Sequence, residues 1–156
     1  MEATLNEDVN KEFKKAFIGS GQDSLYQWKS QNRYIINTNF SSRTMDFWCG
    51  LGYFNLNPDS LTEHPYLGIC LEVSPGCVKR PEIIETMKKI VNETSTKWTP
   101  CNLNLTKDWS SIFYCKSLQE FISEENHVCS IKKYFFESIK ALEEVQKNYL
   151  HLPWKP

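Results

Sequence analysis

The stretch FWCGLGYFNL, residues 47–56, determines what kind of sheet this chain builds. Successive side chains of a β-strand point to opposite faces, so its odd and even positions form two separate surfaces. The odd positions are all suited to a core: Phe47, Cys49, Leu51 and Tyr53. The even positions combine aromatic residues with glycines: Trp48, Gly50, Gly52 and Phe54. Because glycine weakens a strand and offers nothing to pack against, two glycines on one face need a physical reason.

A second stretch, YLGICLEV at residues 66–73, shows the same division between an apolar face and a mixed face. A hairpin across residues 55–65 would place the two mixed faces side by side. We predict the following pairs across it: Phe54 with Tyr66, Gly52 with Gly68, Gly50 with Cys70, and Trp48 with Glu72. A slip of one residue would turn both apolar faces outward, so this register is strongly constrained.

The paired mixed faces form the candidate binding site of this chain, which we call the glycine face. Its predicted members are Trp48, Gly50, Gly52, Phe54, Tyr66, Gly68 and Glu72. Glycines along the floor and aromatic walls would let a partner approach the sheet closely, with Asp46 and Glu72 at one end. The simplest alternative is that a helix of the same chain covers this face, either the N-terminal helix with Phe13 and Phe17 or the C-terminal helix.

The remaining segments predict an α+β domain with an antiparallel sheet of about five strands. Besides the two strands above, which we place at 44–56 and 66–73, short apolar or alternating runs predict strands at 33–38, 101–105 and 111–116. Apolar residues at helical spacing predict helices at 8–18, 81–93 and 127–148, with a short helical stretch after Asp23 and another after the Ser117–Glu120 capping box. Residues 1–7 and 150–156 are expected to be loose tails of one domain that spans residues 1–156.

Composition narrows the classes of function. The 156 residues carry a formal net charge of −1, 40% hydrophobic residues and 13% aromatic residues, which suffices for a packed core. A nucleic-acid-binding protein usually shows a basic patch or stripe, and this chain shows neither, so nucleic acid is not an expected partner. No apolar signal segment and no long apolar stretch is present, which favours a cytoplasmic protein without a membrane span.

The search for catalytic and metal-binding motifs gives one alternative of a different class. Pro58-Asp59 followed by Glu72-Val73-Ser74 resembles the carboxylate motif of metal-dependent nucleases, but serine stands where that motif has lysine. A metal-dependent nuclease or another hydrolase would use Asp59, His64 and Glu72. The six cysteines contain no CxxC pair, and the best zinc set that can be drawn is His64 with Cys70 and Cys77. We therefore expect no cofactor, no metal and no catalytic residue.

These observations favour a small binding or interaction protein over an enzyme. We expect a protein partner, and a role as an inhibitor, immunity factor or adaptor is typical of a free-standing small domain without a catalytic motif. The abundance of Lys, Asn and Ile suggests an AT-rich bacterial or phage genome. The identity of the partner and the oligomeric state do not follow from the residues.

Overall fold

The computed structural model describes residues 8–17, 23–28, 33–39, 46–54, 65–94 and 101–153. Four helices lie in these ranges: α2 (Asp8–Ala16), α3 (Arg80–Thr94), α4 (Gln119–Ile122) and α5 (His127–Asn148). The strands are β1 (Asp23–Trp28), β2 (Arg33–Asn39), β3 (Phe47–Phe54), β4 (Tyr66–Val73), β5 (Cys101–Asn104) and β6 (Ser110–Ser117). The chain is therefore an α+β protein, as its sequence predicts.

All pairs in the sheet are antiparallel, in the order β1-β2-β3-β4-β6-β5. The described strands number six, one more than the sequence predicts. The additional strand is β1, where the sequence analysis expected a short helical stretch. That expectation was wrong because Asp23–Trp28 pairs residue by residue with β2, from Asp23 opposite Thr38 to Trp28 opposite Arg33.

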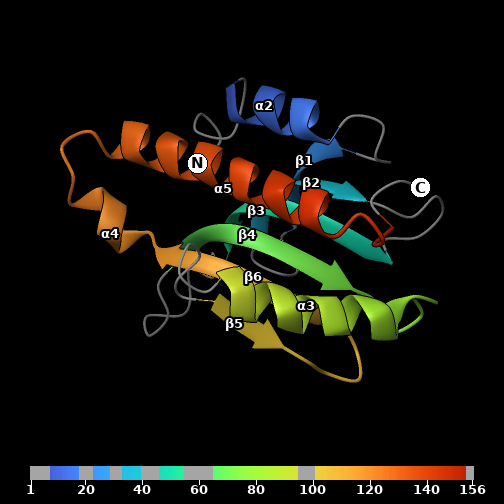
Figure 1. Cartoon of the computed structure of the whole chain (residues 1–156). Helices are drawn as coiled ribbons and strands as arrows, with labels where there is room; N and C mark the ends of the chain where they lie inside the picture. The colour runs from blue at the N-terminus through green and yellow to red at the C-terminus, as the bar shows by residue number, and fades with distance from the viewer. Residues whose placement is uncertain are drawn as a thin grey trace.

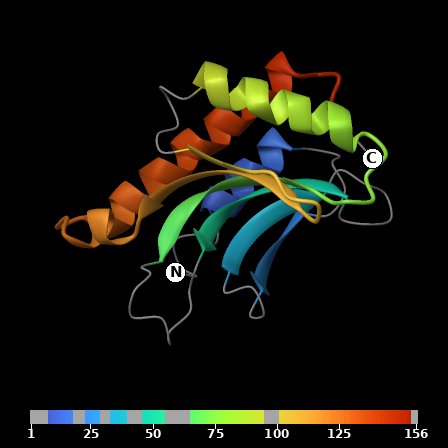
Figure 2. The same ribbon diagram turned by 90° about the horizontal axis from the view of Figure 1, so that it is seen from below.

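The three longer helices lie on one side of the curved sheet, as the two views in Figures 1 and 2 show. Their apolar faces meet the odd positions of β3 and β4 in one core. Val9 and Phe13 of α2, Ile83 and Met87 of α3, and Phe135 of α5 all belong to it. The expectation that α2 or α5 covers the glycine face is therefore wrong, because Phe13 and Phe17 pack on the opposite side of the sheet.

Helix α5 follows the sequence pattern closely. Ile131, Phe135, Ile139, Leu142 and Val145 form its buried stripe, whereas Val128 in the first turn is partly exposed. Phe135 is fully buried and meets the ring of Tyr53 edge-on at a centroid distance of 5.8 Å. One half of the predicted capping box forms, with the backbone amide of Ser117 donating to Glu120 Oε1 at 3.0 Å, while Ser117 Oγ accepts from the amide of Gln119 at 3.3 Å.

The C-terminal segment packs more firmly than the sequence predicts. Leu152 is buried in the main core, and the Thr86 hydroxyl on α3 lies 3.2 Å from His151 Nε2. Tyr149 donates a hydrogen bond to the carboxylate of Glu93, also on α3. Through Pro153 the segment is thus packed against α3, because Leu152 brings an apolar side chain that the core can bury. No helix in the described residues is both long and apolar enough to cross a lipid bilayer.

Candidate functional site

The glycine face has the register that its sequence predicts. Phe54 lies opposite Tyr66, Gly52 opposite Gly68, Gly50 opposite Cys70, and Trp48 opposite Glu72. Strand β6 extends the same rows, with Phe113 beside Cys70 and Cys115 beside Gly68. Residues paired across a sheet share a face, so the predicted members of this site lie together on one surface.

Gly52 and Gly68 each have a structural reason to be glycine. Gly52 has φ of 153°, a conformation that residues with a side chain rarely adopt. At Gly68, a Cβ atom would stand 2.2 Å from the backbone oxygen of Tyr114 and 3.0 Å from Cβ of Cys115. Gly68 therefore lets β6 approach β4, and Gly52 permits the local backbone of β3.

Aromatic rings line this face: Trp48 and Phe54 are buried, whereas Tyr66 and Phe113 are only partly buried. Phe54 stacks on Tyr66 with ring centroids 5.6 Å apart and meets Phe113 edge-on at 5.6 Å. Trp48 and Phe54 each expose only 1% of their surface, and Glu72 exposes 8%. A partner would reach Trp48 and Phe54 only after a rearrangement of the surface above them.

The nuclease alternative finds no support in the described residues. Asp59 and His64 lie outside them, and Glu72 stands between Trp48 and Ser111 in the sheet. Ser74, at the lysine position of the motif, is tied to Asp46: its hydroxyl donates to Asp46 Oδ1 at 2.9 Å and its amide to Asp46 O at 2.7 Å. Within the part of the chain that the structure describes, no three His, Cys, Asp or Glu side chains gather as metal ligands would.

The thiols of the two central strands are suited to packing rather than to chemistry. Cys49 and Cys70 are completely buried, and burial raises the pKa of the Cys49 thiol well above its usual value. The nucleophilic form of cysteine is the thiolate, which a buried apolar setting disfavours. These two residues act as small apolar side chains, as the sequence predicts for cysteines beside apolar neighbours.

A turn that the sequence analysis did not single out joins β5 to β6 and carries exposed apolar side chains. Leu105 exposes 43% and Trp109 exposes 40% of their surface. The turn is closed by its own hydrogen bonds: Thr106 Oγ1 donates to Trp109 O at 2.7 Å, and the Thr106 amide donates to Ser110 Oγ at 3.3 Å. The only hint in the sequence is the polar run before Trp109, which is typical of a turn.

Arg80, the first residue of α3, holds this turn against the sheet. Its guanidinium donates to Val73 O at 3.0 Å, to Thr106 O at 2.7 Å and to Ser110 Oγ at 2.9 Å. The planar fork of arginine suits several acceptors at once. One side chain thus links the end of β4, the turn and the start of β6. We call Leu105–Trp109 with Arg80 the arginine-clamped turn.

Comparison with models of protein families, with curated proteins and with solved structures returns no match in any of the three.

Proposed function

We propose that this chain is a non-enzymatic interaction protein that binds a protein partner, in the manner of an inhibitor, an immunity factor or an adaptor. The observation that supports this most is the exposure of Trp109 on the arginine-clamped turn. Tryptophan is enriched among the few residues that carry most of the energy of protein interfaces. An exposed tryptophan on a well-held turn therefore suits the role of an anchor for a partner.

The rigidity of the turn adds to this argument. Binding costs free energy whenever a loop has to be ordered at the interface, and a turn that is already held avoids part of that cost. Arg80 and the Thr106–Ser110 hydrogen bonds hold the backbone on both sides of Trp109 before any partner arrives. The contact surface of Trp109 is thus pre-organised.

Exposed charges of both signs lie near the turn: Lys107 and Asp108 in it, and Lys79 and Glu82 on either side of Arg80. A partner that offers an apolar socket for Trp109 with charges of both signs at its rim would match this surface. The glycine face stays a second prediction for a partner surface, one that needs a rearrangement to expose Trp48 and Phe54.

The test uses Trp109→Ala with Leu150→Ala as its matched control, because Leu150 is an exposed apolar residue elsewhere, 77% exposed. A partner captured with the wild-type chain is purified, and its affinity for the three proteins is measured by calorimetry. Loss of an interface anchor costs about 2 kcal/mol or more, so Trp109→Ala should weaken binding by about thirtyfold. Leu150→Ala should bind as the wild type does.

The variants must first show the same unfolding midpoint in urea, so that a loss of affinity is not a loss of fold. Equal affinity of Trp109→Ala and wild type for the purified partner would refute the turn as the binding surface. Hydrolysis of DNA or RNA by the wild-type chain with Mg²⁺, lost in a Glu72→Gln variant, would instead support the nuclease alternative.

A further inference from the structure

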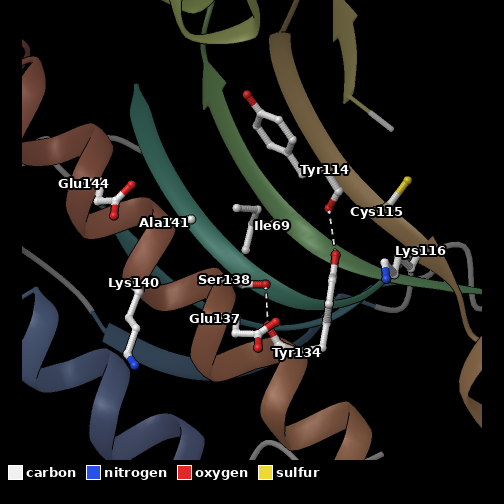
Figure 3. Close-up of a pocket in the computed structure, with 10 residues that line it drawn as sticks. All are labelled: Ile69, Tyr114, Cys115, Lys116, Tyr134, Glu137, Ser138, Lys140, Ala141 and Glu144. Carbon is white, nitrogen blue, oxygen red and sulfur yellow. Dashed lines mark hydrogen bonds between the residues drawn. The ribbon is translucent and has the colours of Figure 1, made fainter. Parts of the chain in front are cut away.

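A cavity of about 310 Å³ lies beside α5, on the side of the sheet that the helices cover. Ile69 of β4 and Tyr114 of β6 line its sheet side, and Ser138 and Ala141 of α5 line its helix side (Figure 3). Helix α5 contacts β3 and β4, whereas α3 contacts β4, β5 and β6. The cavity thus lies over the strands where the cover of one helix gives way to that of the other.

The residues of α5 explain why space is left here. The buried stripe of this helix fills its contact with the sheet. The neighbouring stripe, at the same helical spacing, is Tyr134, Ser138 and Ala141. Two small residues in succession leave open the volume that larger side chains would occupy. The volume left is at the lower end of the range of about 300–1,000 Å³ that ligand sites span, which points to a small ligand.

The deep part of the cavity carries no charge. Ile69, Tyr114 and Ser138 are buried, and Tyr134 and Ala141 are partly buried. Burial raises the pKa of Tyr134, so its phenol is uncharged at neutral pH. A charge that is buried without a partner costs much free energy. This lining therefore favours a ligand without charge.

The charged side chains stand at the rim, where their signs balance. The exposed lining residues are two lysines and two glutamates: Lys116, Lys140, Glu137 and Glu144. Solvent and salt screen exposed charges, so they contribute little to the binding of a ligand below them. Because both signs are equally represented, the rim gives neither an anion nor a cation a net attraction.

Two hydroxyl groups place hydrogen-bond acceptors in the uncharged part. Ser138 Oγ donates to Tyr134 O at 2.7 Å, and the Tyr134 hydroxyl donates to the backbone oxygens of Leu67 at 3.4 Å and Tyr114 at 3.5 Å. Both protons are thus directed at the backbone, which leaves the hydroxyl oxygens able to accept. Ser138 projects from α5 toward the space between Ile69 and Tyr134 (Figure 3). A matching ligand therefore carries a donor.

We propose that this cavity binds a neutral aromatic molecule of about ten non-hydrogen atoms with one N–H or O–H donor. The volume corresponds to about ten water molecules, at about 30 Å³ each. The ring lies against Ile69, Ala141 and the ring of Tyr114, and the donor meets Ser138 Oγ. A rigid ring suits this lining because it has few torsions to immobilise and packs well against tyrosine. This inference rests on the cavity alone and does not depend on the arginine-clamped turn.

The experiment titrates the whole chain with indole and follows backbone amide shifts by NMR. Benzofuran is the matched comparison, because it has the same bicyclic shape with an oxygen in place of the N–H donor. Indole should bind saturably, with a dissociation constant of about 1 mM or below, and shift the amides of Ile69, Ser138 and Ala141. Benzofuran should bind about fivefold more weakly or worse, the loss expected for one neutral hydrogen bond.

Three further ligands test the absence of charge selection. They carry a substituent of similar size at the same ring position: 5-hydroxymethylindole is neutral, indole-5-carboxylate is an anion and 5-aminomethylindole is a cation. Neither charged form should bind more tightly than the neutral form, because the buried lining offers no partner for a charge. Tighter binding of the anion or the cation would overturn the proposal.

Two variants place the ligand in the cavity. Ser138→Ala should weaken the binding of indole by about fivefold and leave that of benzofuran unchanged. Ala141→Leu should fill the cavity and abolish the binding of both, whereas Lys147→Leu, exposed on the same helix and outside the cavity lining, should not. Equal affinity for indole and benzofuran, equal effects of Ser138→Ala on both ligands, unchanged binding by Ala141→Leu, or no saturable binding of indole in the millimolar range would each overturn the proposal.

Discussion

Gly68 lies so close to β6 that a Cβ atom placed on it would stand 2.2 Å from the backbone oxygen of Tyr114. Real Cβ atoms do not approach other atoms to that distance, and the atom in the way belongs to the backbone of the next strand, which cannot swing aside as a side chain can. The glycine is therefore a condition for pairing β4 with β6 in this geometry.

Gly68→Ala should accordingly lower the free energy of unfolding by about 1–3 kcal/mol, the range of overpacked cores. Urea denaturation measures the change. The control is Gly76→Ala, because nothing lies within 4 Å of a Cβ atom at Gly76. That variant should stay within about 0.5 kcal/mol of wild type or become slightly more stable. If the two substitutions cost the same, the contact with Tyr114 does not govern this position.

The buried stripe of α5 predicts a larger effect. Phe135 is fully buried against Tyr53, so Phe135→Ala should cost about 3–5 kcal/mol, as large core deletions do. Ile122→Ala serves as the control, since Ile122 is 58% exposed and should change stability by about 0.5 kcal/mol or less. A small loss for Phe135→Ala would contradict the packing of α5 on the sheet.

Arg80 should stabilise the turn through its three acceptors. Arg80→Met keeps much of the apolar stem and removes the donors, which leaves Val73 O and Ser110 Oγ, both in buried residues, without this partner. We expect a loss of about 1–3 kcal/mol together with faster hydrogen exchange at the amides of Thr106 and Ser110. The control is Lys79→Met, at the exposed neighbour, which should leave the free energy of unfolding and the hydrogen exchange of these two amides unchanged. If hydrogen exchange at these amides is the same in Arg80→Met as in wild type, the turn does not depend on Arg80 for its stability.

The contact between Tyr149 and Glu93 predicts a dependence of stability on alkaline pH. Burial, with the hydrogen bond and the negative charge of Glu93, raises the pKa of Tyr149 to about 12. The phenol titrates near pH 10 in an unfolded chain, so the contribution is complete below about pH 10 and is lost as pH rises through about 12. The unfolding free energy of wild type should therefore fall more steeply across this window than that of Tyr149→Phe. If the unfolding free energies of wild type and Tyr149→Phe fall in parallel with pH, the hydrogen bond from Tyr149 to Glu93 does not contribute to the pH dependence of folding.

The chain should fold without a metal ion and without disulfides. Cys49, Cys70, Cys77, Cys115 and Cys129 are free thiols in this structure. A chelator or a reductant should therefore leave the thermal midpoint unchanged, whereas a fall with either would point to a metal site or a disulfide. The control is an untreated sample at the same ionic strength and protein concentration.

Local pattern was sufficient to predict the centre of the fold. The alternation in 47–54 and 66–73 predicted which residues pair across the hairpin, because only one register buries both apolar faces. The apolar stripe of 127–148 predicted α5, and the Ser117–Glu120 spacing predicted a hydrogen-bonded helix start. In each case the partners lie within one segment or one hairpin, so their spacing along the chain carries the information.

Tertiary structure decided what depends on segments distant along the chain. The segment Asp23–Trp28 is too short for its residue pattern to distinguish a strand from a helix. Its pairing with β2 makes it a strand. Either face of the sheet offers apolar residues, so periodicity alone did not assign α2 and α5 to a side. Arg80 reaches Ser110 across 30 positions, and the cavity joins β4 and β6 to α5. Such contacts leave no periodic trace because they form only when the sheet brings those residues together.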